Sequence, residues 1–113
     1  MEDFKMIVES MAKDGKVSLP ELCERLRMRF RLPERTYYWY VSEDLLPKAT
    51  VVGRDGFYTT DIAQEVFEKV YIIKELKEYT TVRFSTIKAI FANYYERRRL
   101  LIDRLLSWID GYP

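Results

Sequence analysis

The sequence has no histidine and only one cysteine, Cys23, among its 113 residues. A zinc site of His and Cys ligands, a Ser-His-Asp triad, a Cys-His nucleophile and an iron–sulfur centre all require residues that this chain lacks. Chemistry based on carboxylates alone stays open, although the 18 Asp and Glu residues are the scattered acids of a solvated surface. We therefore expect a protein that is not an enzyme and that uses no metal and no cofactor.

Long apolar runs are missing as well. No stretch reaches the roughly 18 apolar residues that a membrane-spanning helix needs. The N-terminus, Met1-Glu2-Asp3, is acidic where a secretory signal peptide is basic, and one cysteine cannot build an internal disulfide framework. These features predict a cytoplasmic protein with no membrane partner.

The residues that are present favour one ordered domain with a basic segment. Hydrophobic residues make up 48% of the chain and charged residues 33%, which is typical of a globular protein. The net charge is only +1, but the segment from Arg25 to Arg54 holds seven basic and three acidic residues and so carries +4. A local basic patch on a near-neutral chain is typical of one polyanion-binding face.

Hydrophobic periodicity predicts a mainly helical chain. Ser18 and Glu21 have the spacing of a capping box, which marks the start of a helix. Cys23 falls on the apolar face of this helix, so we expect a buried structural thiol rather than a reactive one. Apolar residues at helical spacing predict helices over residues 2–13, from about 18, over 61–78, from about 84, and over 93–110.

Arginine occupies every odd position from Arg25 to Arg31. A strand would place these arginines on one face, whereas a helix would distribute them around its circumference. The pattern fits a short strand and also a helix end followed by a turn, and we leave this choice open. The guanidinium groups either contact phosphate, with which arginine makes multidentate hydrogen bonds, or form a solvated face with local ion pairs. We favour phosphate contact.

A third helix, predicted to begin at Pro33-Glu34, carries four consecutive aromatic residues, Tyr37 to Tyr40. Successive helical residues point about 100° apart, so four in a row cannot all be buried on one face. We expect two of them in the core and the others on a rim that contacts the backbone of a polyanion.

Residues 48–58 are typical of a β-hairpin. Two short runs of strand-forming residues flank Gly53-Arg54-Asp55-Gly56, and glycine accepts the positive φ of a tight turn. Arg54 would then lie at the tip of the hairpin. An arginine in a turn is usually only solvated, but its position after the basic helix makes contact with a polyanion an equal alternative.

The last segment, residues 93–110, is amphipathic. Its apolar stripe is wider than a strict coiled-coil seam, so three outcomes stay open: packing on its own domain, antiparallel pairing with a second copy, and docking of another protein. The stripe contains Tyr94, Leu101, Leu105 and Trp108.

The segment TYYWYVSEDLLP, residues 36–47, resembles the recognition helix and following turn of the MerR family of bacterial regulators, where the pattern is T-I-R-Y-Y-E-x-x-G-L-L-P. DGFYTTDI at 55–62 is similar to the family's N-G-Y-R-x-Y-S-x-x-D-L at the end of its wing. IIKEL at 72–76 is similar to its F-I-R-x-L, and residues 84–88 are similar to its L-x-x-I-K. The order and spacing of these pieces carry the resemblance, which covers roughly residues 18–91.

This resemblance implies a mainly α fold, a winged helix-turn-helix with a short β-hairpin wing and a C-terminal amphipathic helix. The recognition helix would span about 33–43 and the wing about 48–58. We expect one domain over 1–113, with an N-terminal helix in 1–17, the winged part in 18–91 and the last helix in 92–113. The implied function is a DNA-binding transcription regulator that binds duplex DNA as a homodimer through the C-terminal helix.

Matching positions and the basic pattern together define the predicted sites. Arg35, near the start of the recognition helix, would favour guanine in the major groove. Tyrosine hydroxyls and the other cations would hold phosphates without reading sequence. The predicted DNA-binding residues are Arg29, Arg31, Arg35, Thr36, Tyr38, Trp39, Tyr40, Lys48, Arg54 and Tyr58. The predicted dimerisation residues are Tyr94, Leu101, Leu105 and Trp108.

The sequence also departs from the family. The family's Arg before the aromatic pair is Tyr38 here, its Glu after the pair is Val41, and its Gly before Leu-Leu-Pro is Asp44. We expect a turn between the first two helices of the motif that is several residues longer, and residues 1–17 have no counterpart. Two alternatives therefore stay open: a protein-interaction module of this fold that has lost DNA binding, and an excisionase-like factor that bends DNA.

Overall fold

The computed structural model of the protein describes residues 4–94. The chain divides into two compact units, Met1–Thr81 and Val82–Pro113. The predicted boundaries at 17/18 and 91/92 differ from this division. The units separate where Thr80 leaves the helical region for extended backbone, with φ −140° and ψ 170°. The β-branched residues at 80–82 account for the break, because branched side chains lose rotamer freedom in a helix.

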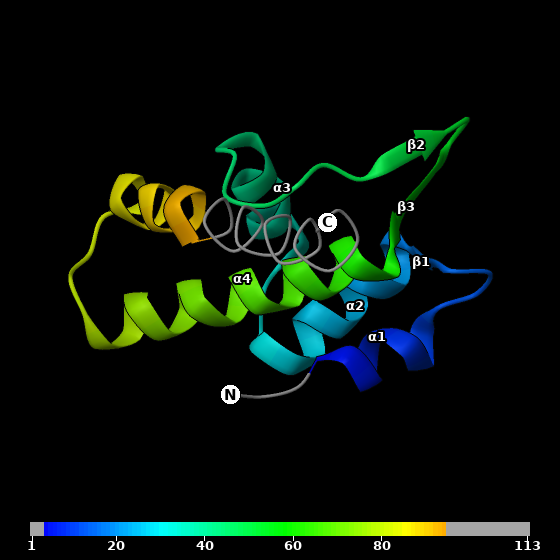
Figure 1. Cartoon of the computed structure of the whole chain (residues 1–113), viewed down its shortest axis with the longest axis horizontal. Helices are drawn as coiled ribbons and strands as arrows, with labels where there is room; N and C mark the ends of the chain where they lie inside the picture. The colour runs from blue at the N-terminus through cyan, green and yellow to red at the C-terminus, as the bar shows by residue number, and fades with distance from the viewer. Residues whose placement is uncertain (1–3, 95–113) are drawn as a thin grey trace, which may run out of the picture. The chain divides into compact units, whose positions relative to one another are not determined.

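The first unit is mainly helical, with a small three-stranded antiparallel sheet (Figure 1). Its elements are α1 (Lys5–Met11), β1 (Lys16–Ser18), α2 (Leu19–Phe30), α3 (Glu34–Ser42), β2 (Thr50–Val52), β3 (Asp55–Thr59) and α4 (Thr60–Tyr79). In the second unit a helix occupies residues 84–94 of the described part. The helix starts and the hairpin agree with the sequence predictions to within a few residues.

The core of the first unit lies between α1, α2 and α4, which Figure 1 shows side by side. Phe4 stacks on Phe67 of α4, with ring centroids 5.7 Å apart, and Phe30 at the end of α2 tilts against the same ring at 6.2 Å. The predicted apolar stripe of α4 is buried at its four central positions, Val66, Phe67, Val70 and Ile73. Burying aromatic rings of this size dominates core energetics.

The sheet has the order β1-β3-β2, so β3 is its central strand. Val17 of β1 lies opposite Tyr58, and both side chains are buried. Thr50 of β2 lies opposite Phe57. The hairpin was predicted, but β1 was not, because three residues with one buried side chain leave no periodic signal.

The arginine-rich segment is helical. Leu22, Cys23 and Leu26 are buried on one face of α2, and the helix continues to Phe30. Arg31 ends it in the left-handed region, with φ 55° and ψ 36°. The helical alternative is therefore confirmed, and the arginines are distributed around the circumference instead of forming one row.

Candidate nucleic-acid interface

Helices α2 and α3 are joined by only three residues, Arg31, Leu32 and Pro33. Leu32 is buried and its N–H bonds to the Leu26 carbonyl at 3.5 Å, while Pro33 at the start of α3 has the fixed φ that suits a helix entry. The expectation of a turn several residues longer was wrong, because those additional residues belong to helix α2.

Arg31 holds a left-handed conformation that favours glycine, and no glycine stands there. We expect Arg31→Gly to raise the free energy of unfolding by about 1 kcal/mol, because the Cβ strain disappears. The same substitution at Arg25, inside α2, should instead cost about 1 kcal/mol. Urea denaturation of both variants checks the prediction, and a loss of stability with Arg31→Gly would contradict it.

The end of α3 also has a non-glycine residue with positive φ. The N–H of Leu45 bonds to the Tyr40 carbonyl at 2.9 Å and that of Asp44 to the Val41 carbonyl at 3.1 Å, which is the pattern of a Schellman motif. Asp44 takes φ 59°, at the position where the MerR pattern has glycine. Aspartate tolerates this region better than most residues, so the departure from the pattern leaves the helix end intact.

The four aromatic residues of α3 divide into an inner and an outer pair. Tyr37 and Tyr40 are buried, whereas Tyr38 and Trp39 are 49% and 43% exposed. This agrees with the prediction of two core aromatics. It also corrects the assignment of Tyr40 to DNA: that ring is only 6% exposed, because it lies on the face of α3 that packs inward.

Two consecutive hydrogen bonds link Tyr37 of α3, Tyr58 of β3 and Pro47 in the loop before the hairpin, and we call this series the Tyr37–Tyr58–Pro47 chain. The Tyr58 hydroxyl donates to the Pro47 carbonyl at 2.6 Å. Its only proton is then used, so the Tyr37 hydroxyl donates to Tyr58 Oη, 2.5 Å away. Burial raises the pKa of both tyrosines, which keeps the chain protonated and intact over the physiological pH range.

The Tyr37–Tyr58–Pro47 chain fixes α3 against strand β3. The burial of Tyr58 in it also corrects a second site prediction. Tyr58 was expected to contact DNA, but its side chain is 2% exposed and its hydroxyl is engaged inside the protein. A matching position in a sequence pattern does not specify the direction in which the side chain points. Strand residues alternate between faces, and position 58 is on the inner face.

Each outer ring is supported by an inner ring. Tyr38 meets Tyr37 edge-on, with centroids 5.1 Å apart and an interplanar angle of 70°, and Trp39 tilts on Tyr40 at 5.8 Å. Such aromatic pairs favour edge-to-face and tilted contacts. The two exposed rings are therefore held in place before any partner binds.

The exposed cations near α3 and the hairpin have no acidic partner within residues 4–94. Arg35, Lys48 and Arg54 are exposed and form no ion pair there. Thr36 is half-buried on the flank of α3. Arg35 lies on the same outward stripe of the helix as Tyr38, three residues later.

The other arginines of the predicted basic segment lie on different sides of helix α2 or in the turn that follows it. Arg27 is paired with Glu24 at 2.6 Å, so for this residue the alternative of a local ion pair holds and not the favoured phosphate contact. This pair lowers the pKa of Glu24 through a hydrogen bond. By helix geometry, Arg25 and Arg29 lie on the opposite side of α2 from the Arg27–Glu24 side. The structure therefore does not bring Arg29 together with the α3 residues, while Arg31 is exposed in the α2–α3 turn.

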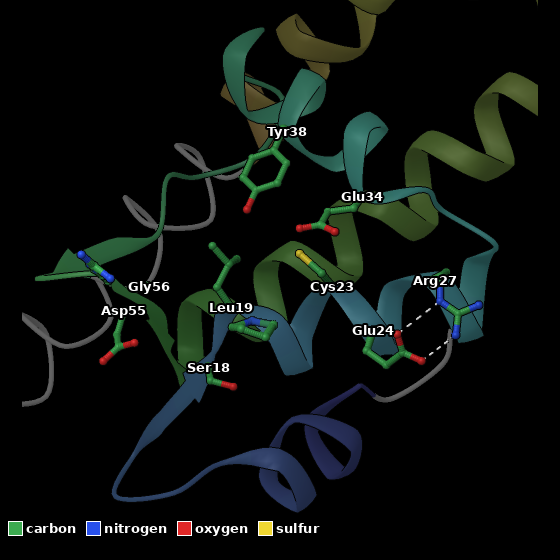
Figure 2. Close-up of a pocket in the computed structure, with 11 residues that line it drawn as sticks. Ser18, Leu19, Cys23, Glu24, Arg27, Glu34, Tyr38, Asp55 and Gly56 are labelled. Atoms are coloured by element: carbon green, nitrogen blue, oxygen red, sulfur yellow. Dashed lines mark hydrogen bonds and ion pairs between the residues drawn. The ribbon is translucent and has the colours of Figure 1, made fainter.

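A cavity of about 430 Å³ opens between the start of α2, the first turn of α3 and the tip of the hairpin (Figure 2). Figure 2 shows the carboxylate of Glu34, the thiol of Cys23 and the hydroxyl of Tyr38 pointing toward the same space. The lining residues are Ser18, Leu19, Pro20, Cys23, Glu24, Arg27, Glu34, Tyr38, Arg54, Asp55 and Gly56.

Three acids of this cavity, Glu24, Glu34 and Asp55, were not among the predicted site residues. Glu24 is paired with Arg27, whereas Glu34 and Asp55 form no ion pair in the described part of the chain. The signal that sequence reasoning overlooked is the i, i+4 spacing of Glu34 and Tyr38, which puts both on one side of a helix. Cys23 is buried as predicted. Its burial and the charge of Glu34 raise its pKa to about 11, so the thiol stays protonated and poorly nucleophilic at neutral pH.

The predicted dimer contacts lie in the second unit. Tyr94 is in the helix over 84–94, whereas Leu101, Leu105 and Trp108 are outside the described residues. Pairing of two copies therefore stays a prediction. Within residues 4–94, no helix combines the length and apolar character needed to cross a bilayer. No three Cys, Asp or Glu side chains in the same range are grouped to hold a metal ion.

Comparison with protein-family models, with curated proteins and with solved structures found no match to this chain. The likeness to the MerR pattern consequently depends on the sequence of this chain alone, at residues 36–47, 55–62, 72–76 and 84–88.

Proposed function

We propose that the protein is a transcription regulator that binds duplex DNA, with α2 and α3 as a helix-turn-helix, α3 as the recognition helix and the β2–β3 hairpin as a wing. One observation carries the proposal: α3 directs Arg35, Tyr38 and Trp39 away from the core, after a three-residue turn that is typical of this motif. A recognition helix of this kind reads the major groove with its N-terminal residues.

Arg35 and the hairpin supply complementary roles in this proposal. Arg35, in the first turn of α3, suits bidentate bonding to guanine. Lys48 and Arg54, before and within the hairpin, suit phosphate contacts that set the register of the protein on the duplex. The Tyr37–Tyr58–Pro47 chain holds α3 and the hairpin in one arrangement, so a duplex would meet a preorganised surface.

A second candidate function is a protein-interaction module. Glu34 points into the cavity beside Tyr38 (Figure 2), and a carboxylate at this place opposes a phosphate backbone. Tyrosine and tryptophan are also frequent hot spots of protein interfaces. This candidate predicts an aromatic contact with a protein and no dependence on nucleic acid.

Salt dependence separates the two functions. Binding to a random-sequence duplex depends on phosphate contacts, so on such DNA we expect Arg35 to hold a phosphate together with Lys48 and Arg54. With three such contacts, the affinity of the full chain for a random 24-base-pair duplex should fall about 40-fold from 50 to 200 mM salt. Fluorescence anisotropy of a labelled duplex measures both affinities. Absence of binding at 50 mM salt, or an affinity that salt does not change, would favour the protein-interaction module.

A further inference from the structure

Tyr38 occupies the most exposed aromatic position of α3, and its surroundings differ from those of a phosphate-binding tyrosine. The ring is 49% exposed and borders the cavity between α2, α3 and the hairpin. No hydrogen bond from its hydroxyl is present within the described residues. Its neighbours therefore decide which part of a duplex it fits.

The side of α3 that carries Tyr38 is unfavourable to phosphate. Glu34 precedes Tyr38 by one helical turn, and Figure 2 shows its carboxylate directed toward the space below the Tyr38 ring. Leu19 and Cys23 form an apolar floor on the α2 side of that space. Of the two cations that line the same cavity, Arg27 is paired with Glu24 and Arg54 belongs to the hairpin. A phosphate placed directly below the Tyr38 ring would therefore meet the charge of Glu34 and two apolar side chains. The edge of a base carries no net charge, so it loses less solvation and is repelled less at this place.

The Tyr38 ring is also rigid enough to discriminate between small groups. It contacts Tyr37 edge-on at 5.1 Å, and Tyr37 is fixed in turn by its hydrogen bond to Tyr58. A side chain that is ordered before binding loses little rotamer entropy when a partner arrives. Burial also raises the pKa of the Tyr38 hydroxyl, so the side chain stays neutral.

A neutral, ordered ring beside an apolar floor fits a base edge that presents an apolar group. In the major groove of unmodified DNA, thymine alone presents a methyl group, and apolar side chains recognise it by contact. We propose that Tyr38 is a specificity-determining residue that reads the 5-methyl group of thymine beside the base contacted by Arg35. The inference depends on the proposed function and replaces the phosphate-holding role that the MerR pattern implies for tyrosine hydroxyls.

The test uses deoxyuridine, which lacks only the 5-methyl group. The full chain is first used to select its preferred duplex from a pool with 12 random base pairs, a length of roughly one helical turn, and each thymine of that duplex is then replaced by deoxyuridine. We expect one replacement to weaken binding roughly fourfold, which is the contribution of one buried methyl group. Tyr38→Phe, which keeps the ring, should show the same loss, and Tyr38→Ala should bind both duplexes equally.

The outcomes distinguish the inference from the function on which it depends. A selected duplex without thymine, an affinity unchanged by every deoxyuridine, or unchanged discrimination in Tyr38→Ala would each overturn the assignment of Tyr38 while leaving DNA binding in place. Failure to enrich any duplex would overturn the proposed function and the inference together. Circular dichroism of Tyr38→Ala serves as the folding control, because removal of a side chain that is 49% exposed should leave the helix content unchanged.

Discussion

Replacing Tyr58 by phenylalanine is expected to lower the free energy of unfolding by about 3 kcal/mol. The substitution removes the donor to the half-buried Pro47 carbonyl and the acceptor for the buried Tyr37 hydroxyl, and it leaves both groups without these partners. An unsatisfied buried polar group costs about 1–3 kcal/mol, and here two such groups arise from one substitution. Urea denaturation followed by circular dichroism measures the change.

Two further variants show whether the loss of stability comes from breaking the Tyr37–Tyr58–Pro47 chain or from the loss of any tyrosine hydroxyl. Tyr37→Phe removes one donor but leaves the bond from Tyr58 to Pro47 in place, so we expect a loss of only about 1 kcal/mol. Tyr38→Phe removes an exposed hydroxyl and should change stability by less than about 0.5 kcal/mol. Equal losses for Tyr58→Phe and Tyr37→Phe would show that Pro47 is not the acceptor.

The helical parts of the fold were predictable because periodicity reports burial directly. In α4, the spacing of Val66, Phe67, Val70 and Ile73 specified the buried face. The alternating arginines were ambiguous, because alternation over eight residues fits a strand and a helix end alike. The apolar residues before them, Leu22 and Leu26, settle the matter in the structure by continuing the buried face of α2 into the arginine-rich part.

The site was predictable in outline and not in detail. Arg35, Lys48 and Arg54 are exposed as the predicted interface requires, whereas Tyr40 and Tyr58 are buried. The reason is that side-chain direction depends on packing partners distant in the chain: Tyr58 pairs with Val17 in a strand that leaves no sequence signal. The cavity of Glu34 and Asp55 was missed for the same reason, because three separate elements enclose it.

We expect DNA affinity to depend on where the arginines lie on the protein surface, and not only on their number. We expect Arg35→Ala together with Arg54→Ala to weaken binding of a random duplex about a hundredfold at 50 mM salt, and to reduce the slope of log affinity against log salt by about two. Both side chains are exposed and form no ion pair in the described residues, so the fold should be unaffected. Fluorescence anisotropy gives the affinities and circular dichroism the fold.

The matched control is Arg25→Ala together with Arg29→Ala. It removes the same net charge from the side of α2 opposite to the Arg27–Glu24 pair, where neither arginine lines the cavity between α2, α3 and the hairpin. We expect at most a threefold loss of affinity, the size of a long-range charge effect screened by salt. Equal losses in the two double variants would mean that the duplex contacts the arginine-rich helix as the sequence first indicated, and would move the interface from α3 to α2.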